Sequence, residues 1–206
     1  MPDSVEILYD HYKDTCNGIG EAIRRRERLM LWVIGMLGLF AFQTAFPAAT
    51  STALSEFLVF KFGIPLEVDL SVIGTVIWFA LLMFTVRYFQ TVVLVERRTA
   101  YVQQAEKFLN KKLDGEFITR EGKAYETGYP MFSTWTWILY TIVFPALLLL
   151  VSTVKIICDW ASIGFTCPPS IYLVLNSVAY GLMTVSIVLY LLMVHAPAKK
   201  PVPSEE

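Results

Sequence analysis

Residues 95–130 read VERRTAYVQQAEKFLNKKLDGEFITREGKAYETGYP, and this stretch decides the architecture of the chain. Its 36 residues carry seven basic and six acidic side chains, in a 206-residue protein that is 55% hydrophobic. Long apolar runs lie before and after it. A charged block between such runs indicates a polar segment that joins membrane-spanning helices.

The apolar runs have the length of membrane spans, since a helix needs about 20 apolar residues to cross the hydrocarbon core. The alternative, four buried helices of a soluble protein, fails because so small a domain cannot cover four helices that are apolar on all sides. We therefore expect an all-α integral membrane protein. The four predicted spans are residues 29–48, 70–86, 132–154 and 171–194.

The distribution of Lys and Arg predicts the orientation of these spans. Fifteen of the 17 basic residues fall in 1–28, 87–131 and 195–206, and only Lys61 and Lys155 fall in the two alternate segments. The positive-inside rule then puts both termini and the middle block in the cytoplasm. The predicted parts are a cytosolic amphipathic helix (1–28), a transmembrane hairpin (29–86), a cytosolic helix plus hairpin (87–131), a second transmembrane hairpin (132–194) and a cytosolic tail (195–206).

The middle block is predicted to continue the second span as a helix. Val95, Val102 and Leu109 recur every seven residues, and the helix should end at Asp114-Gly115. The segment EFITREGKAY (116–125) then indicates two short strands or an irregular hairpin.

The N-terminal segment has an apolar face of its own. Its members follow each other at three- and four-residue steps, and they are Val5, Leu8, Tyr12, Cys16, Ile19 and Ile23. We expect this face to pack on the stripe of the middle helix and form a small cytosolic helical layer. A helix lying flat on the membrane is the alternative, but its arginines cluster at one end.

Two of the three cysteines flank the short loop between the third and fourth spans. Cys158 and Cys167 are predicted to form a disulfide there, because that loop faces outward and an oxidising compartment favours pairing. The alternative is two free thiols at the membrane edge. A bacterial inner membrane with a periplasmic outer face fits this arrangement.

Catalytic signatures do not stand out in the sequence. There is no CxxC, HExxH, nucleophile elbow or phosphate-binding glycine loop, and we expect neither an enzyme nor a cofactor or metal. The predicted spans contain no Asp, Glu, Lys or Arg, which argues against an ion-coupled transporter. The net charge of −1 and the lack of motifs predict no sequence-specific nucleic-acid recognition.

Polar residues within the spans are candidates for a pore or hinge. Gln43, Thr44, Asn176 and Ser177 either hydrogen-bond between helices of one protomer or line an oligomeric pore. Pro145 lies within the third span and is expected to kink it near Thr141, with a gating hinge as the further hypothesis.

Basic residues of the middle block are candidates for a ligand site. An oligomer could bring them around an axis to hold an anionic nucleotide. The alternative is positive-inside bias with contact to anionic lipid headgroups. The candidates are Arg97, Arg98, Lys107, Lys111, Lys112 and Arg120.

Residues 8–113 resemble small membrane effectors of bacterial conflict systems in their layout. HYKDTCNGIGEAIRRRERL (11–29), a membrane hairpin and VERRTAYVQQAEKFLNKKL (95–113) are similar to SLATT-type effectors and to multi-pass proteins paired with nucleotidyltransferases in anti-phage operons. Such proteins have two spans, and residues 132–194 depart from that pattern. The resemblance implies an oligomeric pore that depolarises the membrane when a nucleotide signal arrives.

We therefore expect a homo-oligomeric inner-membrane effector, a pore or channel gated from the cytoplasm by an anionic, nucleotide-type signal in anti-phage defence. Its expected partners are the lipid bilayer, copies of itself and a nucleotide ligand or cytosolic signalling enzyme. The alternative is a non-enzymatic membrane scaffold subunit that docks a soluble cytosolic partner.

Overall fold

The computed structural model describes residues 4–63, 70–115, 118, 135, 138–163 and 169–195. These residues are almost entirely helical, and they contain no strand. The helices are α1 (Ser4–Ala45), α2 (Pro47–Phe62), α3 (Leu70–Lys112), a π-helical segment η1 (Leu139–Val143), α6 (Phe144–Ile163) and α7 (Ile171–His195). Four of them are long and apolar enough to cross a membrane, which confirms this part of the predicted fold class.

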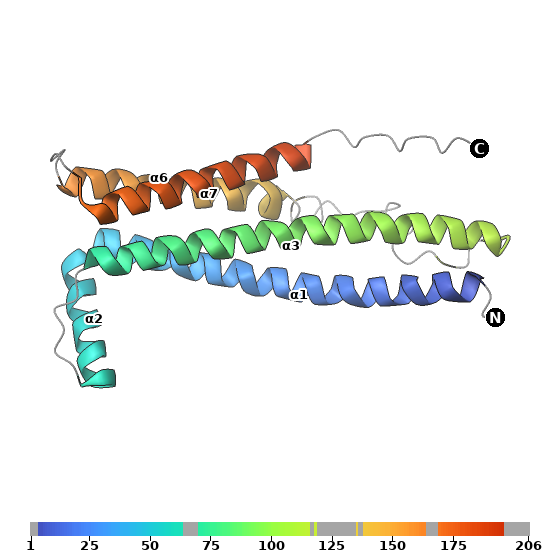
Figure 1. The fold of residues 1–206 in the computed structure, drawn as a ribbon, viewed down its shortest axis with the longest axis horizontal. Coiled ribbons are helices and arrows are strands. Elements are labelled where there is room, and N and C mark those ends of the chain that lie inside the picture. Colours follow the sequence, from blue (N-terminus) through green and yellow to red (C-terminus); the bar gives the residue numbers. More distant parts are fainter. Residues whose placement is uncertain are drawn as a thin grey trace.

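The long helices α1 and α3 run side by side along the length of the molecule (Figure 1). Their 42 and 43 residues correspond to about 63 Å each at 1.5 Å per residue, twice the thickness of a hydrocarbon core. The predicted helix 1–28 and the predicted span 29–48 are thus parts of one helix. Gly18 and Gly20 lie inside α1 and do not break it.

The first predicted span ends earlier than expected, and the segment after it is a helix. Pro47 cannot continue α1, because its ring clashes with the preceding turn, but it suits the first turn of a new helix. α2 starts there and projects sideways from the bundle (Figure 1). It ends at Gly63, whose positive φ of 68° and N–H bond to the Val59 carbonyl close the helix. α1 therefore ends three residues before the predicted boundary at residue 48.

The main core lies where α6 and α7 cover one end of the α1–α3 pair (Figure 1). Phe40 of α1 meets Trp78 of α3 with ring centroids 4.8 Å apart. Further along, Phe89 of α3 stacks on Tyr190 of α7 at 4.2 Å. These aromatic pairs join α1, α3 and α7, and Leu148 of α6 is fully buried in the same core.

A second core lies where α1 and α3 extend beyond α6 and α7. Tyr12 and Ile19 of α1 pack there with Val102 and Leu109 of α3, and Ala105 completes the buried set. The predicted packing of the N-terminal face on the seven-residue stripe is confirmed. Val102 is fully buried in this contact with α1 of the same chain.

The end of α3 is closed by the turn at Asp114-Gly115 and by the side chain of Asn110. Asp114 has a positive φ of 49°, and the Gly115 N–H bonds to the Asn110 carbonyl, so the predicted end of the helix is confirmed. The Asn110 amide also donates to the Ile118 carbonyl at 2.7 Å and accepts from the Ile118 N–H at 2.9 Å. The strands or hairpin predicted over 116–125 lie outside the described residues, apart from Ile118.

The third predicted span differs from expectation in its end and in its charges. The π-helical segment η1 ends two residues before Pro145, which lacks the N–H that a regular turn needs. α6 then continues to Ile163, nine residues beyond the predicted end at residue 154. It therefore carries Lys155 and Asp159 beyond the predicted end of the span.

Candidate functional site

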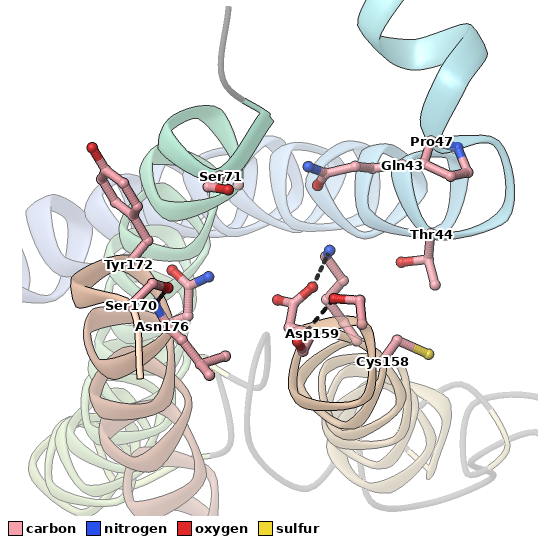
Figure 2. Close-up of a pocket in the computed structure, with 13 residues that line it drawn as sticks. Gln43, Thr44, Pro47, Ser71, Cys158, Asp159, Ser170, Tyr172 and Asn176 are labelled. Atoms are coloured by element: carbon pink, nitrogen blue, oxygen red, sulfur yellow. Dashed lines mark hydrogen bonds and ion pairs between the residues drawn. The ribbon is translucent and has the colours of Figure 1, made fainter. Parts of the chain in front are cut away.

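A polar pocket of about 270 Å³ lies among the four long helices, at the end of the bundle from which α2 leaves (Figure 2). Its walls come from the end of α1, the start of α2, the start of α3, the second half of α6 and the start of α7. The lining residues with polar side chains are Gln43, Thr44, Ser71, Lys155, Cys158, Asp159, Ser162, Ser170, Tyr172 and Asn176.

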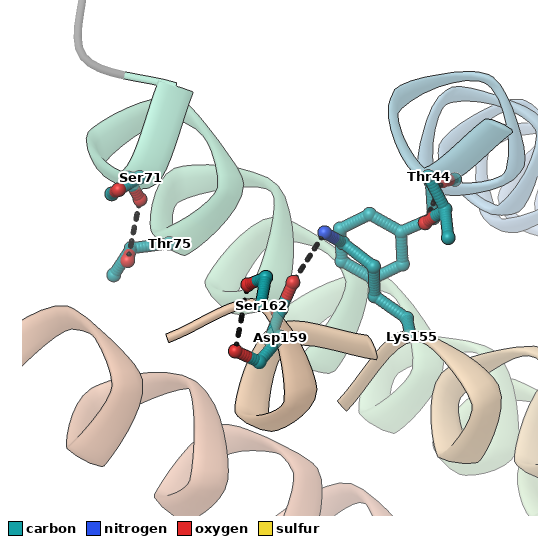
Figure 3. Close-up of polar contacts among 7 residues, drawn as sticks. Thr44, Ser71, Thr75, Lys155, Asp159 and Ser162 are labelled. Atoms are coloured by element: carbon teal, nitrogen blue, oxygen red, sulfur yellow. Dashed lines mark hydrogen bonds and ion pairs between the residues drawn. The ribbon is translucent and has the colours of Figure 1, made fainter. Parts of the chain in front are cut away.

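An ion pair forms one wall of the pocket. Lys155 Nζ donates to Asp159 Oδ1 at 2.6 Å, and the two side chains are only 9% and 19% exposed (Figure 3). The ammonium also lies 5.9 Å from the centroid of the Phe40 ring. Two buried charges need each other, because an isolated charge in a low-dielectric interior costs several kcal/mol. Lys155 and Asp159 lie four residues apart on α6 and neutralise each other, so both can lie in this apolar helix.

Asn176 of α7 faces the same space (Figure 2). Its side chain is buried, with 6% exposure, and its Oδ1 has no hydrogen-bond partner among the residues that the structure describes. Buried amide oxygens are nearly always hydrogen-bonded. A donor bound in the pocket would supply the bond that Asn176 Oδ1 lacks.

Close packing brings Gln43 into the opposite wall. Gly74 of α3 has no side chain, and a Cβ built there would lie 3.4 Å from Gln43 Nε2. The missing side chain thus leaves room for the Gln43 amide, which is 8% exposed. Thr44, the next residue, donates its hydroxyl to the Phe40 carbonyl of its own helix at 2.8 Å.

Three of the five predicted pore or hinge residues meet in this pocket. Gln43, Thr44 and Asn176 line it together, whereas Pro145 is buried near the other end of α6. Ser177 instead accepts a hydrogen bond from Trp160 Nε1 at 3.2 Å, which is the interhelical alternative. The sequence reasoning missed Lys155 and Asp159, although opposite charges four residues apart after an apolar run were the available signal.

The predicted ligand-binding residues divide into three groups. Arg97, Lys107, Lys111 and Lys112 are exposed on α3. Arg98 is half-buried against α1, since a Cβ at Gly18 would lie 2.7 Å from its Nη1, so it packs between the helices and does not extend freely. Arg120 lies outside the described residues.

The exposed basic residues of α3 alternate with aromatic ones. Tyr101 and Phe108 are 43% and 51% exposed and follow Arg97 at steps of four and seven residues. Lys112 Nζ lies 5.9 Å from the centroid of the Phe108 ring. We call Arg97, Tyr101, Lys107, Phe108 and Lys111 the basic–aromatic face of α3. By helical position it lies away from the buried stripe at Val102 and Leu109.

Other predicted features are only partly placed. Cys158 is half-buried in the pocket wall, but Cys167 lies outside the described residues, so the disulfide stays a prediction. Within the described part of the chain, no three His, Cys, Asp or Glu side chains group as metal ligands would.

Comparison with known proteins finds no matching family model, no similar curated protein and no similar solved structure. The function must therefore be argued from the two sites themselves, the pocket and the basic–aromatic face.

Proposed function

We propose that this chain is a homo-oligomeric membrane effector, a pore or channel opened by an anionic, nucleotide-type ligand in anti-phage defence. The observation that carries the proposal is the unbroken length of α1 and α3. Each helix runs from the part beyond α6 and α7 to the polar pocket without an intervening loop. A ligand that shifts one helix against the other at the far end therefore displaces Gln43 against Gly74 in the pocket.

The basic–aromatic face has the chemistry that a nucleotide requires. Arg97, Lys107 and Lys111 offer cationic donors to phosphate oxygens, and aromatic rings such as Tyr101 and Phe108 stack on bases. A single exposed helix face gives a ligand only one wall. A second copy of the chain would supply the other, which is why the proposal includes an oligomer.

The bundle surface offers α1 a place for close helix contact. A Cβ built at Gly35 or Gly38 would meet nothing within 4 Å, so these two glycines leave a shallow open strip on the first span. Small residues at such positions let helices of separate copies approach closely in a membrane.

The proposal is tested by flux through liposomes that contain the purified full chain. Cyclic dinucleotides and cyclic trinucleotides are the probes, and release of an entrapped dye is the readout. Replacing Arg97, Lys107 and Lys111 by Gln should lower the nucleotide response at least tenfold. The matched control replaces Lys13, Arg24 and Arg28 by Gln, which are exposed on α1 and change the net charge equally.

If both triple variants keep the flux response, the basic–aromatic face is not the nucleotide site. If the liposomes do not leak with any probe at any protein density, the chain does not form a pore.

The second candidate function is a scaffold, and one observation favours it. Positions along α3 at alternating steps of three and four residues are all exposed, which is the spacing of a coiled-coil seam. Its apolar members, Leu94, Tyr101 and Phe108, recur every seven residues. These positions are Arg87, Gln90, Leu94, Arg97, Tyr101, Gln104, Phe108 and Lys111. A soluble helix bound along this seam, with no flux, would support docking over conduction.

A further inference from the structure

The pocket holds donors that its own residues do not use. Lys155 is 7% exposed, and within the described residues its ammonium makes one hydrogen bond, to Asp159 Oδ1 at 2.6 Å. An ammonium carries three N–H groups. The remaining donors border the pocket, where an anionic oxygen would satisfy them.

The pocket also holds acceptors that lack donors. Asn176 Oδ1 has no partner in the part of the chain that the structure describes, although 94% of the residue is buried. The Asp159 carboxylate can accept about four hydrogen bonds, of which Lys155 supplies one. A ligand group that satisfies these oxygens must donate, as an ammonium does.

The net charge of the pocket limits which ligand can satisfy both its donors and its acceptors. The Lys155–Asp159 pair is neutral as a unit, and its two charges are largely buried. A simple anion or a simple cation would add an uncompensated charge to this interior, which is unfavourable. A molecule that carries both charges adds none.

We propose that the pocket binds a zwitterion in which a primary ammonium is joined to a phosphate. The phosphate accepts from Lys155, and the ammonium donates to Asp159 and Asn176. The pocket volume of about 270 Å³ lies below the usual range for drug-sized ligands, about 300–1,000 Å³, and suits such a group. The inference goes beyond pore activity and does not depend on it.

The position of the pocket indicates where such a zwitterion would come from. Four span-length helices begin or end around it, and α2 leaves the bundle at this level (Figures 1 and 2). Lipid headgroups lie where membrane helices end. Phosphatidylethanolamine carries the required group there, and free phosphoethanolamine is the soluble source of the same chemistry.

Native mass spectrometry of the full chain in detergent tests the proposal. Phosphatidylethanolamine, phosphatidylcholine and phosphatidylglycerol with identical acyl chains are added separately. The quaternary ammonium of phosphatidylcholine has no N–H to donate, and phosphatidylglycerol has no cation. We expect phosphatidylethanolamine to be retained at least fivefold more than either of the others. Equal retention of all three lipids would overturn the proposal.

Variants connect the binding to the pocket. Asn176→Leu removes the unpaired acceptor, and Lys155→Met combined with Asp159→Leu removes both charges together. Each should reduce the preference for phosphatidylethanolamine to below twofold. Thr85→Val is the matched control, because Thr85 is a buried polar residue of the bundle that does not line the pocket. If both pocket variants keep the full preference, the pocket is not the site, and Asn176→Leu alone suffices for this test if the double variant does not fold.

Excess phosphoethanolamine distinguishes the two sources. Displacement of the lipid by phosphoethanolamine would support recognition of the headgroup alone. Retention of the lipid would support a membrane lipid whose acyl chains also bind. Both results require that Asn176→Leu lowers binding of the added molecule.

Discussion

At the scale of the residue, Lys155 precedes Asp159 on α6, which is the less favourable order for a helix. The carboxylate is nearer the C-terminus, where the helix dipole disfavours an anion. The pair therefore does little for the stability of α6 itself. Its burial beside Asn176 and Gln43 indicates that its place in the pocket matters more than its place in the helix.

Removing one partner of this pair should destabilise the fold far more than removing both. Lys155→Met leaves the Asp159 carboxylate largely buried without its counter-ion, which should cost about 3–5 kcal/mol, or on the order of 10 °C in apparent Tm. Lys155→Met with Asp159→Leu should lie within about 1 kcal/mol of the parent, because apolar replacement of a buried pair is often neutral. Thermal unfolding in one detergent, followed by tryptophan fluorescence, measures both.

Equal destabilisation by the single and the double variant would show that the ion pair contributes through its packing alone.

The residues of the pocket differ in how far sequence could reveal them. Gln43, Thr44 and Asn176 stand out, because any polar residue within a long apolar run is conspicuous. Lys155 and Asp159 did not, because a charge normally ends a span and their mutual neutralisation depends on a helix that continues past residue 154. The closeness of Gly74 to Gln43 could not be predicted, since this contact exists only in the folded bundle.

Among the helices, α3 carries two neighbouring series of apolar residues that recur every seven positions, one buried and one exposed. Val95, Val102 and Leu109 face α1, whereas Leu94, Tyr101 and Phe108 are exposed. The sequence predicted the contact of Val95, Val102 and Leu109 with α1, because the N-terminal segment has an apolar stripe that matches theirs. It did not predict α2, because Pro47 marks the end of one helix and the beginning of another equally well.

Aspartate substitutions at adjacent positions separate the two series. Val102→Asp puts a charge into the contact between α1 and α3, and we expect this to cost more than about 3 kcal/mol and release the N-terminal half of α1. Tyr101→Asp places the same charge at a position 43% exposed and should leave the contact intact. Hydrogen exchange over residues 4–28 measures the release.

The membrane-spanning halves of α1 and α3 should remain protected from hydrogen exchange in both variants. Unchanged protection of residues 4–28 in Val102→Asp would mean that α1 does not depend on this contact.

At the scale of the whole molecule, the length of α1 and α3 places their far ends well outside any bilayer that α6 and α7 cross. Fifteen of 17 basic residues lie in the segments predicted to be cytoplasmic. We therefore expect the far ends of α1 and α3 to lie in the cytoplasm and α2 on the opposite side. The structure has four helices of span length, and the charge distribution predicts which end of the bundle is cytoplasmic.

Cysteine labelling in intact cells tests this orientation. In a background with Cys16, Cys158 and Cys167 replaced by Ser, Thr52→Cys on α2 should react with a membrane-impermeant maleimide. Lys111→Cys should react only after the cells are permeabilised. Both original side chains are exposed, so access to the reagent depends on the membrane alone. The reverse labelling pattern would invert the topology and place the basic–aromatic face outside the cell.

The contact between Tyr12 and Glu106 has a consequence for how the chain is made. The Tyr12 hydroxyl donates to the Glu106 carboxylate at 3.0 Å, across 94 residues of sequence. A ribosome adds about 5–20 residues per second, so the apolar face of the nascent N-terminal segment waits about 5–19 s for the helix that covers it. Two spans must also enter the membrane in that interval. The newborn chain thus has a defined window in which a chaperone can bind residues 5–23, and slower translation of residues 24–109 would lengthen it.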